Sequence, residues 1–187
     1  MEYPAQAFAY IHGFNSDKNS RSYRDIKALL GNVHDFYYNY RQEAQFAYIE
    51  IEEKLSAVYE KNPDLKLIGS SLGGFFTLLF AQKYALPCTV FNPVTYPHKQ
   101  LAPFIGTNYN FYTHEEWDFT QNLLLSYKEF PLSTAMKFVP NIVLGSNDTV
   151  ISPHVALSFW KGKANILLTA NEHSINNYHA YKSLFLK

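Results

Sequence analysis

The chain has 187 residues, which is enough for one domain that buries a sizeable hydrophobic core. Sixteen basic and sixteen acidic residues cancel, and there is no basic stripe or long run of like charge. Nucleic acid and anionic membrane surfaces are therefore not expected partners. We expect residues 1–187 to form a single domain, and the composition leaves its oligomeric state open.

Cysteine usage and the N-terminus bear on where the protein works. Cys88 is the single cysteine, so an intramolecular disulfide framework is excluded and a reducing compartment is favoured. The first ten residues lack a basic region, and the apolar run at 7–11 is too short for a signal sequence. No stretch has the length of a membrane span. We therefore expect a cytoplasmic protein.

The first half of the chain alternates short apolar runs with stretches in which apolar residues recur at helical spacing. In chain order the expected elements are strand 7–11, helix 22–30, strand 33–40, helix 43–59, strand 65–68 and helix 75–84. The helix at 43–59 is expected to place its apolar side chains on one side, namely Phe46, Ile49, Leu55 and Val58.

The second half continues the alternation after one change of character. A strand at 87–91 is followed by a polar and aromatic stretch, 95–130, which is expected to hold one or two helices, such as 118–127. The remaining expected elements are strand 137–144, helix 153–160, strand 165–169 and helix 175–186. Apolar strands that alternate with helices predict an α/β fold, with a mostly parallel sheet of about six strands and helices on both faces.

The most informative motif joins the third expected strand to its helix. Gly69-x-Ser71-x-Gly73 between a strand and a helix is typical of a nucleophile elbow. A serine on such a sharp turn needs small residues two positions to either side. Ser71 has a glycine at both, whereas Ser70 would have an isoleucine and a leucine. The alternative interpretation is a glycine-rich turn without chemistry.

A serine nucleophile needs a base to take its proton and an acid to orient that base. Asp148 follows the fifth expected strand and suits the acid, although an Asx turn or helix cap would also explain it. His173, after the sixth strand, completes the chain order Ser, Asp, His of this arrangement. His179 is the rival base, but it lies inside the expected last helix. His154 is interpreted as part of a helix start.

The negative oxygen of an acyl-transfer intermediate needs two backbone N–H donors. We expect these to be the amides of Leu72, directly after the nucleophile, and of Phe14, in the loop after the first strand. Gly13 allows that loop to approach closely. His12 is interpreted as a brace for the loop and is also kept as a tentative substrate contact.

Several stretches together carry a family resemblance. They are His12-Gly13-Phe14-Asn15-Ser16, Gly69-Ser70-Ser71-Leu72-Gly73-Gly74, Phe91-Asn92-Pro93, Gly145-Ser146-Asn147-Asp148 and the segment with Tyr112-Thr113 and Glu115-Glu116. The chain resembles the small YqiA/YcfP-like family of bacterial α/β-hydrolases. The resemblance implies a reduced α/β-hydrolase fold and esterase or thioesterase activity. Carried over by position, it implies Ser71 as nucleophile, Asp148 as acid and His173 as base.

The sequence thus predicts a serine hydrolase that cleaves a small-molecule acyl ester or thioester through an acyl-enzyme. The stretch 95–130 is expected to form a lid-like insertion in which Tyr112 and Trp117 contact substrate, unless its aromatic residues only cover the sheet edge. No metal or other cofactor is expected, because the sequence has no H-E-x-x-H, paired cysteines, phosphate loop or dinucleotide fingerprint. The alternative function is that of a catalytically silent binding or scaffold protein with the same fold.

Overall fold

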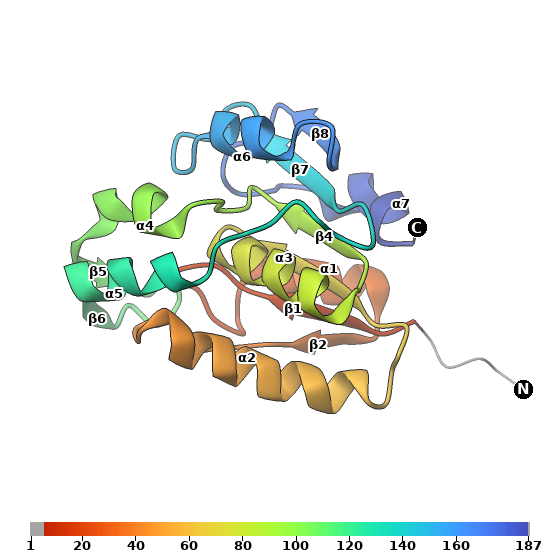
Figure 1. Cartoon of the computed structure of the whole chain (residues 1–187), viewed down its shortest axis with the longest axis horizontal. Helices are drawn as coiled ribbons and strands as arrows, with labels where there is room; N and C mark the ends of the chain where they lie inside the picture. Colours follow the sequence, from red (N-terminus) through yellow and green to blue (C-terminus); the bar gives the residue numbers. More distant parts are fainter. Residues whose placement is uncertain (1–5, 187) are drawn as a thin grey trace, which may run out of the picture.

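A six-stranded parallel sheet in the order β2-β1-β3-β4-β7-β8 forms the centre of the molecule (Figure 1). The computed structural model describes residues 6–186, so the first five residues of the N-terminal segment considered above lie outside it. The strands of this sheet are β1 (Phe8–Ile11), β2 (Val33–Asp35), β3 (Lys66–Ser70), β4 (Cys88–Phe91), β7 (Asn141–Gly145) and β8 (Asn165–Thr169). The predicted α/β architecture with its parallel sheet is confirmed.

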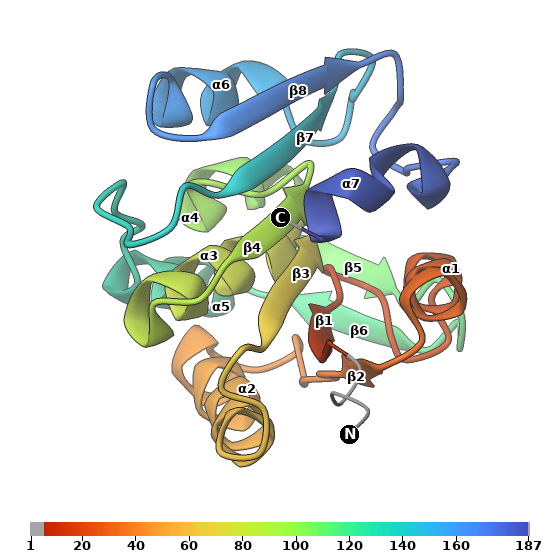
Figure 2. The ribbon, with the colours of Figure 1, turned by 90° about the vertical axis from the view of Figure 1, so that its right-hand side faces the viewer.

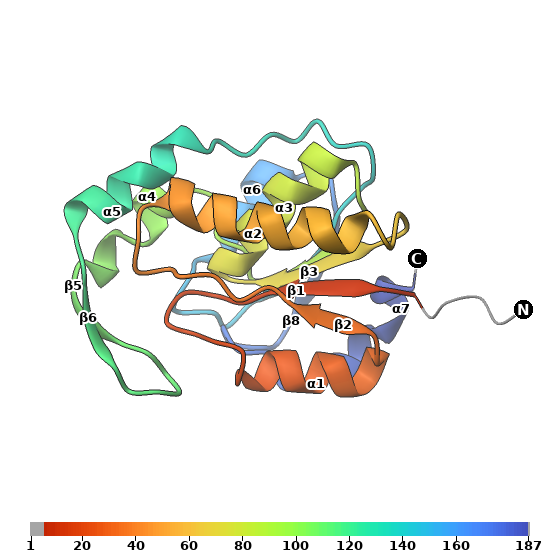
Figure 3. The same ribbon diagram turned by 90° about the horizontal axis from the view of Figure 1, so that it is seen from below.

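Helices cover both faces of this sheet (Figures 2 and 3). One face carries α1 (Arg21–Leu30), a 3-10 turn (Tyr178–Tyr181) and α7 (Lys182–Phe185), and the other carries α2 (Ala44–Tyr59), α3 (Leu72–Tyr84) and α6 (Pro153–Trp160). Each layer has its own buried apolar cluster against the sheet. Cys88 is buried, as the apolar run around it predicts.

The insertion after β4 differs from the expected one or two helices because it contains a β-hairpin. Its elements are α4 (Pro97–Gln100), a 3-10 turn (Ala102–Phe104), β5 (Gly106–Tyr109), β6 (Glu116–Phe119), α5 (Gln121–Ser126) and a second 3-10 turn (Tyr127–Glu129). The helix expected at 118–127 therefore starts later. Thr120 caps α5 by accepting a hydrogen bond from the Leu123 amide at 3.3 Å, and the two residues before it belong to β6.

The expected buried side of the helix at 43–59 is right for Leu55, which is buried, and for Val58, which packs against the core, but wrong for Phe46 and Ile49. Phe46 and Ile49 are about half exposed, and the residues of α2 that face the core are Ala44, Ala47, Ile51 and Leu55. The prediction gave most weight to large apolar residues, so it placed Phe46 and Ile49 on the buried side, where the structure has Ala44 and Ala47.

Three other elements differ in extent. The strand expected at 33–40 ends at Asp35, after which Tyr38 and Tyr40 are buried by packing under the loop that follows β1 rather than by pairing in the sheet. The strand expected at 137–144 begins only at Asn141, because Pro140 has no N–H to donate to a neighbouring strand. The helix expected at 175–186 is reduced to the 3-10 turn and α7.

No helix within residues 6–186 is both long and apolar enough to cross a membrane. The carboxyl ends of β1, β3, β4, β7 and β8 meet at one edge of the sheet, because all of these strands run in the same direction. Loops that leave this edge carry the residues predicted to act in catalysis. Such an edge is the usual position of ligand sites in open parallel sheets.

Candidate active site

Ser71 occupies a strained turn between β3 and α3. Its backbone has φ 54° and ψ −123°, a conformation that side-chain-bearing residues rarely adopt. The glycines at either side are sterically required. A Cβ on Gly73 would collide with the carbonyl oxygens of Ile11 and His12, and one on Gly69 would collide with the Thr77 hydroxyl. The turn therefore exposes the serine hydroxyl only with small residues at these positions.

Backbone hydrogen bonds from the neighbouring strand hold the turn in place. The Ser71 amide donates to the Phe91 carbonyl at 2.9 Å, and the Val94 amide donates to the Ser71 carbonyl at 3.0 Å. Gly74 lies against Pro93, so that an added Cβ would be 2.9 Å from the proline Cβ. The strained turn is thus fixed from both sides by the end of β4 and the residues after it.

Asp148 and His173 form a direct pair. The His173 Nδ1–H donates to Asp148 Oδ2 at 2.7 Å, while Asp148 Oδ1 accepts from the amides of Val150 and Ile151 at 2.8 and 2.9 Å. The Asx turn and the histidine contact therefore use different oxygens of one carboxylate. Burial opposes its ionisation, but the His173 bond and the two amides outweigh burial and hold the pKa of Asp148 below its usual value.

Ser71 and His173 line one open cavity of about 120 Å³, together with Gly13, Phe14 and Tyr112. The structure gives no hydrogen bond between the Ser71 hydroxyl and His173 among the described residues. Hydrogen bonds between a nucleophile and its base are often long in ligand-free enzymes and shorten with substrate bound. The structure thus brings the three predicted catalytic residues to one site and leaves the serine–histidine contact open.

The loop after β1 runs beside the nucleophile. A Cβ on Gly13 would lie 3.1 Å from the Ser71 Cβ, so only a glycine allows this approach. The amides of Phe14 and Leu72 donate no hydrogen bond to any residue in the described part of the chain; Leu72 directly follows Ser71, and Phe14 lines the same cavity as Ser71. Two unpaired N–H groups beside a serine hydroxyl are the arrangement that an oxyanion requires.

His12 fixes the orientation of this loop through two hydrogen bonds of its ring. Its Nδ1–H donates to the Gly13 carbonyl at 3.0 Å, and its Nε2 accepts from the Tyr38 amide at 3.4 Å. Because the Gly13 carbonyl and the Phe14 N–H belong to one planar peptide, holding the carbonyl also sets the direction of the N–H. Burial lowers the pKa of His12 to about 4, so the ring is neutral at pH 7.

The three residues expected to contact substrate lie in different places in the structure. Tyr112 lines the cavity and is partly exposed, whereas His12 and Trp117 are buried and do not line it. Trp117 instead donates its indole N–H to Asn15 Oδ1 at 2.8 Å, and the Asn15 amide group donates to Asn108 at 3.0 Å. His12 and Trp117 therefore brace the loop beside Ser71 from two sides, a role predicted for His12 and missed for Trp117.

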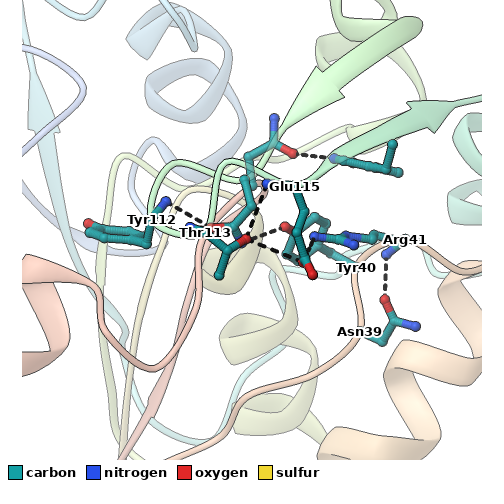
Figure 4. A network of polar contacts seen from close by, with 9 residues as sticks. Asn39, Tyr40, Arg41, Tyr112, Thr113 and Glu115 are labelled. Carbon is teal, nitrogen blue, oxygen red and sulfur yellow. Dashed lines mark hydrogen bonds and ion pairs between the residues drawn. The ribbon is translucent and has the colours of Figure 1, made fainter.

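The tip of the β5–β6 hairpin is tied down by a polar network (Figure 4). Arg41 forms an ion pair with Glu115 at 2.8 Å, and the buried Asn110 donates to the Tyr40 hydroxyl at 2.8 Å. On the other side of the tip, the Tyr112 hydroxyl accepts from the first amide of α1 at 3.1 Å. These contacts hold Tyr112 at the rim of the cavity.

Asn92 belongs to a stretch that carries the family resemblance, but the sequence analysis gave it no role in the site. Its Oδ1 accepts from the Gly145 amide at 2.7 Å, and its Nδ2 donates to the carbonyls of Glu172 and His173 at 3.0 and 2.8 Å. Asn92 thus joins the loop that carries Asp148 to the loop that carries His173. The signal available in the sequence was the Asn-Pro step after a strand, which by itself indicates only a turn.

The remaining histidines considered as bases lie elsewhere. His179 is exposed in the 3-10 turn before α7, and His154 is exposed near the start of α6. Neither lines the cavity with Ser71. Within residues 6–186, no group of three or more His, Cys, Asp or Glu side chains is arranged to hold a metal ion.

Comparison with known families agrees with this geometry. Residues 7–185 match the model of the Uncharacterised protein family (UPF0227), the YqiA/YcfP family. The chain belongs to this family. The predicted resemblance is therefore confirmed over nearly the whole length of the chain.

Solved structures with the same fold include named esterases and hydrolases. Est1E from Butyrivibrio proteoclasticus has a TM-score of 0.75 at 15% identity, covering 98% of this chain and 88% of that one. Alpha/beta hydrolase domain-containing protein 10 from mouse has a TM-score of 0.73 at 11% identity, covering 98% and 89%. The Pyrococcus furiosus esterase Pf2001 has 0.64 at 16%, covering 96% and 80%. At these identities the likeness establishes the fold, a reduced α/β-hydrolase fold.

Proposed function

We propose that this protein is a serine esterase or thioesterase. The observation that carries the proposal is the strained Ser71 turn, which shares a cavity with a histidine already paired to a buried carboxylate at 2.7 Å. A carboxylate that accepts from Nδ1 leaves Nε2 of His173 as the basic nitrogen. That is the nitrogen which a serine nucleophile requires.

In the proposed reaction, His173 Nε2 takes the proton of the Ser71 hydroxyl as the oxygen attacks the carbonyl carbon of the ester. The negative oxygen is bound by the amides of Phe14 and Leu72, and each such donor is worth about 3 kcal/mol in comparable sites. His173 then gives its proton to the leaving alcohol or thiol. Water, activated by the same histidine, attacks the acyl-enzyme and releases the acid.

The depressed pKa of Asp148 suits this role. An acid that stays ionised at neutral pH stabilises the imidazolium that forms when His173 takes a proton. The esterases among proteins of the same fold support a hydrolytic reaction as well. An ester or a thioester would fit the same catalytic residues.

Labelling with a fluorophosphonate, followed by mass spectrometry of the modified peptide, tests the proposal. We expect one adduct on Ser71 in the native chain, none in Ser71→Ala, and full labelling in Ser158→Ala, which removes an exposed hydroxyl on α6. A folded native chain that carries no adduct would contradict the proposal and favour a binding protein.

A further inference from the structure

The cavity beside Ser71 has an unusual chemical lining. Nearly all of its polar side chains are hydroxyls, contributed by Tyr10, Ser16, Ser20, Ser22, Ser70, Ser71, Tyr112, Ser174 and Tyr178. Among residues 6–186, no lysine, arginine, aspartate or glutamate lines it, and His173 contributes its one imidazole. The lining therefore offers hydrogen bonds without a counter-charge, although the Arg21 guanidinium lies beside it and donates to the carbonyl of the lining residue Ile175 at 2.6 Å.

Four of these hydroxyls form what we call the hydroxyl cluster, defined by Tyr10, Ser22, Ser70 and Tyr178. The Tyr178 hydroxyl donates to Ser22 Oγ at 2.8 Å, and the Tyr10 and Ser70 hydroxyls are 2.9 Å apart. Burial raises the pKa of Tyr10 to about 12, although the hydroxyls of Ser70 and Ser22 oppose the rise. The cluster is thus neutral at physiological pH, and its member Ser70 directly precedes the nucleophile in the chain.

The cluster has hydrogen-bonding capacity to spare. Four hydroxyls carry four hydrogens and eight lone pairs, and the two hydrogen bonds use two of each. Donors and acceptors therefore remain for a ligand that reaches the floor of the cavity. At its rim stand the exposed rings of Phe111 and Tyr112, which suit a flat apolar group next to the polar end.

We propose that the hydroxyl cluster is a specificity site for an uncharged, hydroxyl-bearing group of the substrate, placed a few bonds from the carbonyl that Ser71 attacks. This inference rests on the proposed esterase function. A hydroxyl both donates to and accepts from the cluster, whereas a carboxylate or ammonium entering the same space would be desolvated without an opposite charge in the lining. An alkyl end would leave the polar floor unpaired, the situation by which sites reject analogues that lack a hydroxyl.

The test compares kcat/KM for matched esters on the full chain. One series varies the acid: the methyl esters of 3-(4-hydroxyphenyl)propanoic, 3-phenylpropanoic and 3-(4-carboxyphenyl)propanoic acid. The other places the same three groups on the alcohol of an acetate ester. We expect the hydroxylated ester of at least one series to exceed its unsubstituted analogue by about tenfold or more, and the carboxylate to be poorest. The series that shows the preference tells which side of the ester enters the cavity.

Matched variants then locate the preference. In Ser22→Ala and Tyr178→Phe, the ratio of hydroxylated to unsubstituted ester should fall to near one. The control is the other tyrosine–serine pair of the fold, Ser56 and Tyr84, whose hydroxyls are 2.8 Å apart between α2 and α3 on the opposite face of the sheet. Ser56→Ala and Tyr84→Phe should keep the native ratio.

Two results would overturn the inference while leaving the esterase proposal intact. One is a native enzyme, labelled at Ser71 by fluorophosphonate, that shows no hydroxyl preference in either series. The other is a preference that survives in both Ser22→Ala and Tyr178→Phe. Failure of the label itself would instead remove the proposed function.

Discussion

The turn at Ser71 and the loop that carries His173 reach the same cavity by opposite means. The turn is constrained by collisions: with side chains at Gly69 or Gly73 it could not close. The histidine loop, residues 170–177, has little regular structure and is placed by a hydrogen bond that His173 donates to Asp148 and by two that the loop accepts from Asn92, both far away in the sequence. The conformation of the Ser71 turn is thus determined by five consecutive residues, whereas the position of the His173 loop depends on residues distant in the sequence.

Removing the reacting groups should have the largest effect on either side of this comparison. We expect Ser71→Ala and His173→Ala each to lower kcat on an activated ester by about 10⁶-fold, because both act as one unit. Circular dichroism should show an intact fold. His179→Ala is the matched control and should keep native turnover; if it were inactive instead, the assignment of the base would be wrong.

The second largest effect is expected from adding a side chain to the Ser71 turn, which should lower the stability of the fold. Gly73→Ala pushes a methyl group into the Ile11 and His12 carbonyls, which should lower the free energy of unfolding by about 3 kcal/mol in urea titrations. Gly162→Ala is the control, since its Cβ would meet no atom within 4 Å. It should cost only about 1 kcal/mol, for a left-handed backbone. Equal losses would mean that the collision at Gly73 is relieved by movement.

Weakening the histidine loop should impair catalysis more than binding. Asn92→Asp keeps the acceptor for the Gly145 amide but loses the two N–H bonds to the carbonyls of Glu172 and His173. We expect kcat to fall by about 10- to 100-fold with KM little changed, because a displaced base misaligns proton transfer. Asn62→Ala, which removes a side-chain bond at the end of α2, should leave both constants unchanged. An increase in KM alone would contradict the positioning role.

The smallest expected effect concerns His12, in the loop after β1, and the dependence of stability on pH. His12 is neutral in the fold with a pKa of about 4, whereas an unfolded histidine has a pKa near 6.5, so the unfolded state binds more protons between these values. Stability from neutral His12 is present above pH 6.5 and is lost as the pH falls. From pH 7 to pH 5, native protein should lose about 2 kcal/mol more than His12→Asn. Equal slopes in urea titrations would show that His12 is protonated at little cost.

The sequence by itself determined the parallel α/β fold and the nucleophile turn. Apolar runs of strand length report burial directly, and glycines on both sides of Ser71 report a steric requirement that is local. The chain order of Ser71, Asp148 and His173 also came from sequence, because parallel strands deliver their carboxyl ends to one edge.

Tertiary structure alone decided which residues hold that arrangement together. Asn92 contacts residues 53 to 81 positions away in the sequence, and nothing in a polar residue before a proline specifies such partners. The hairpin that braces Asn15 and the alanine face of α2 were missed for a related reason. What a hairpin packs against, and which face of a helix meets the core, depend on what the rest of the chain places opposite them, and local patterns carry no record of it.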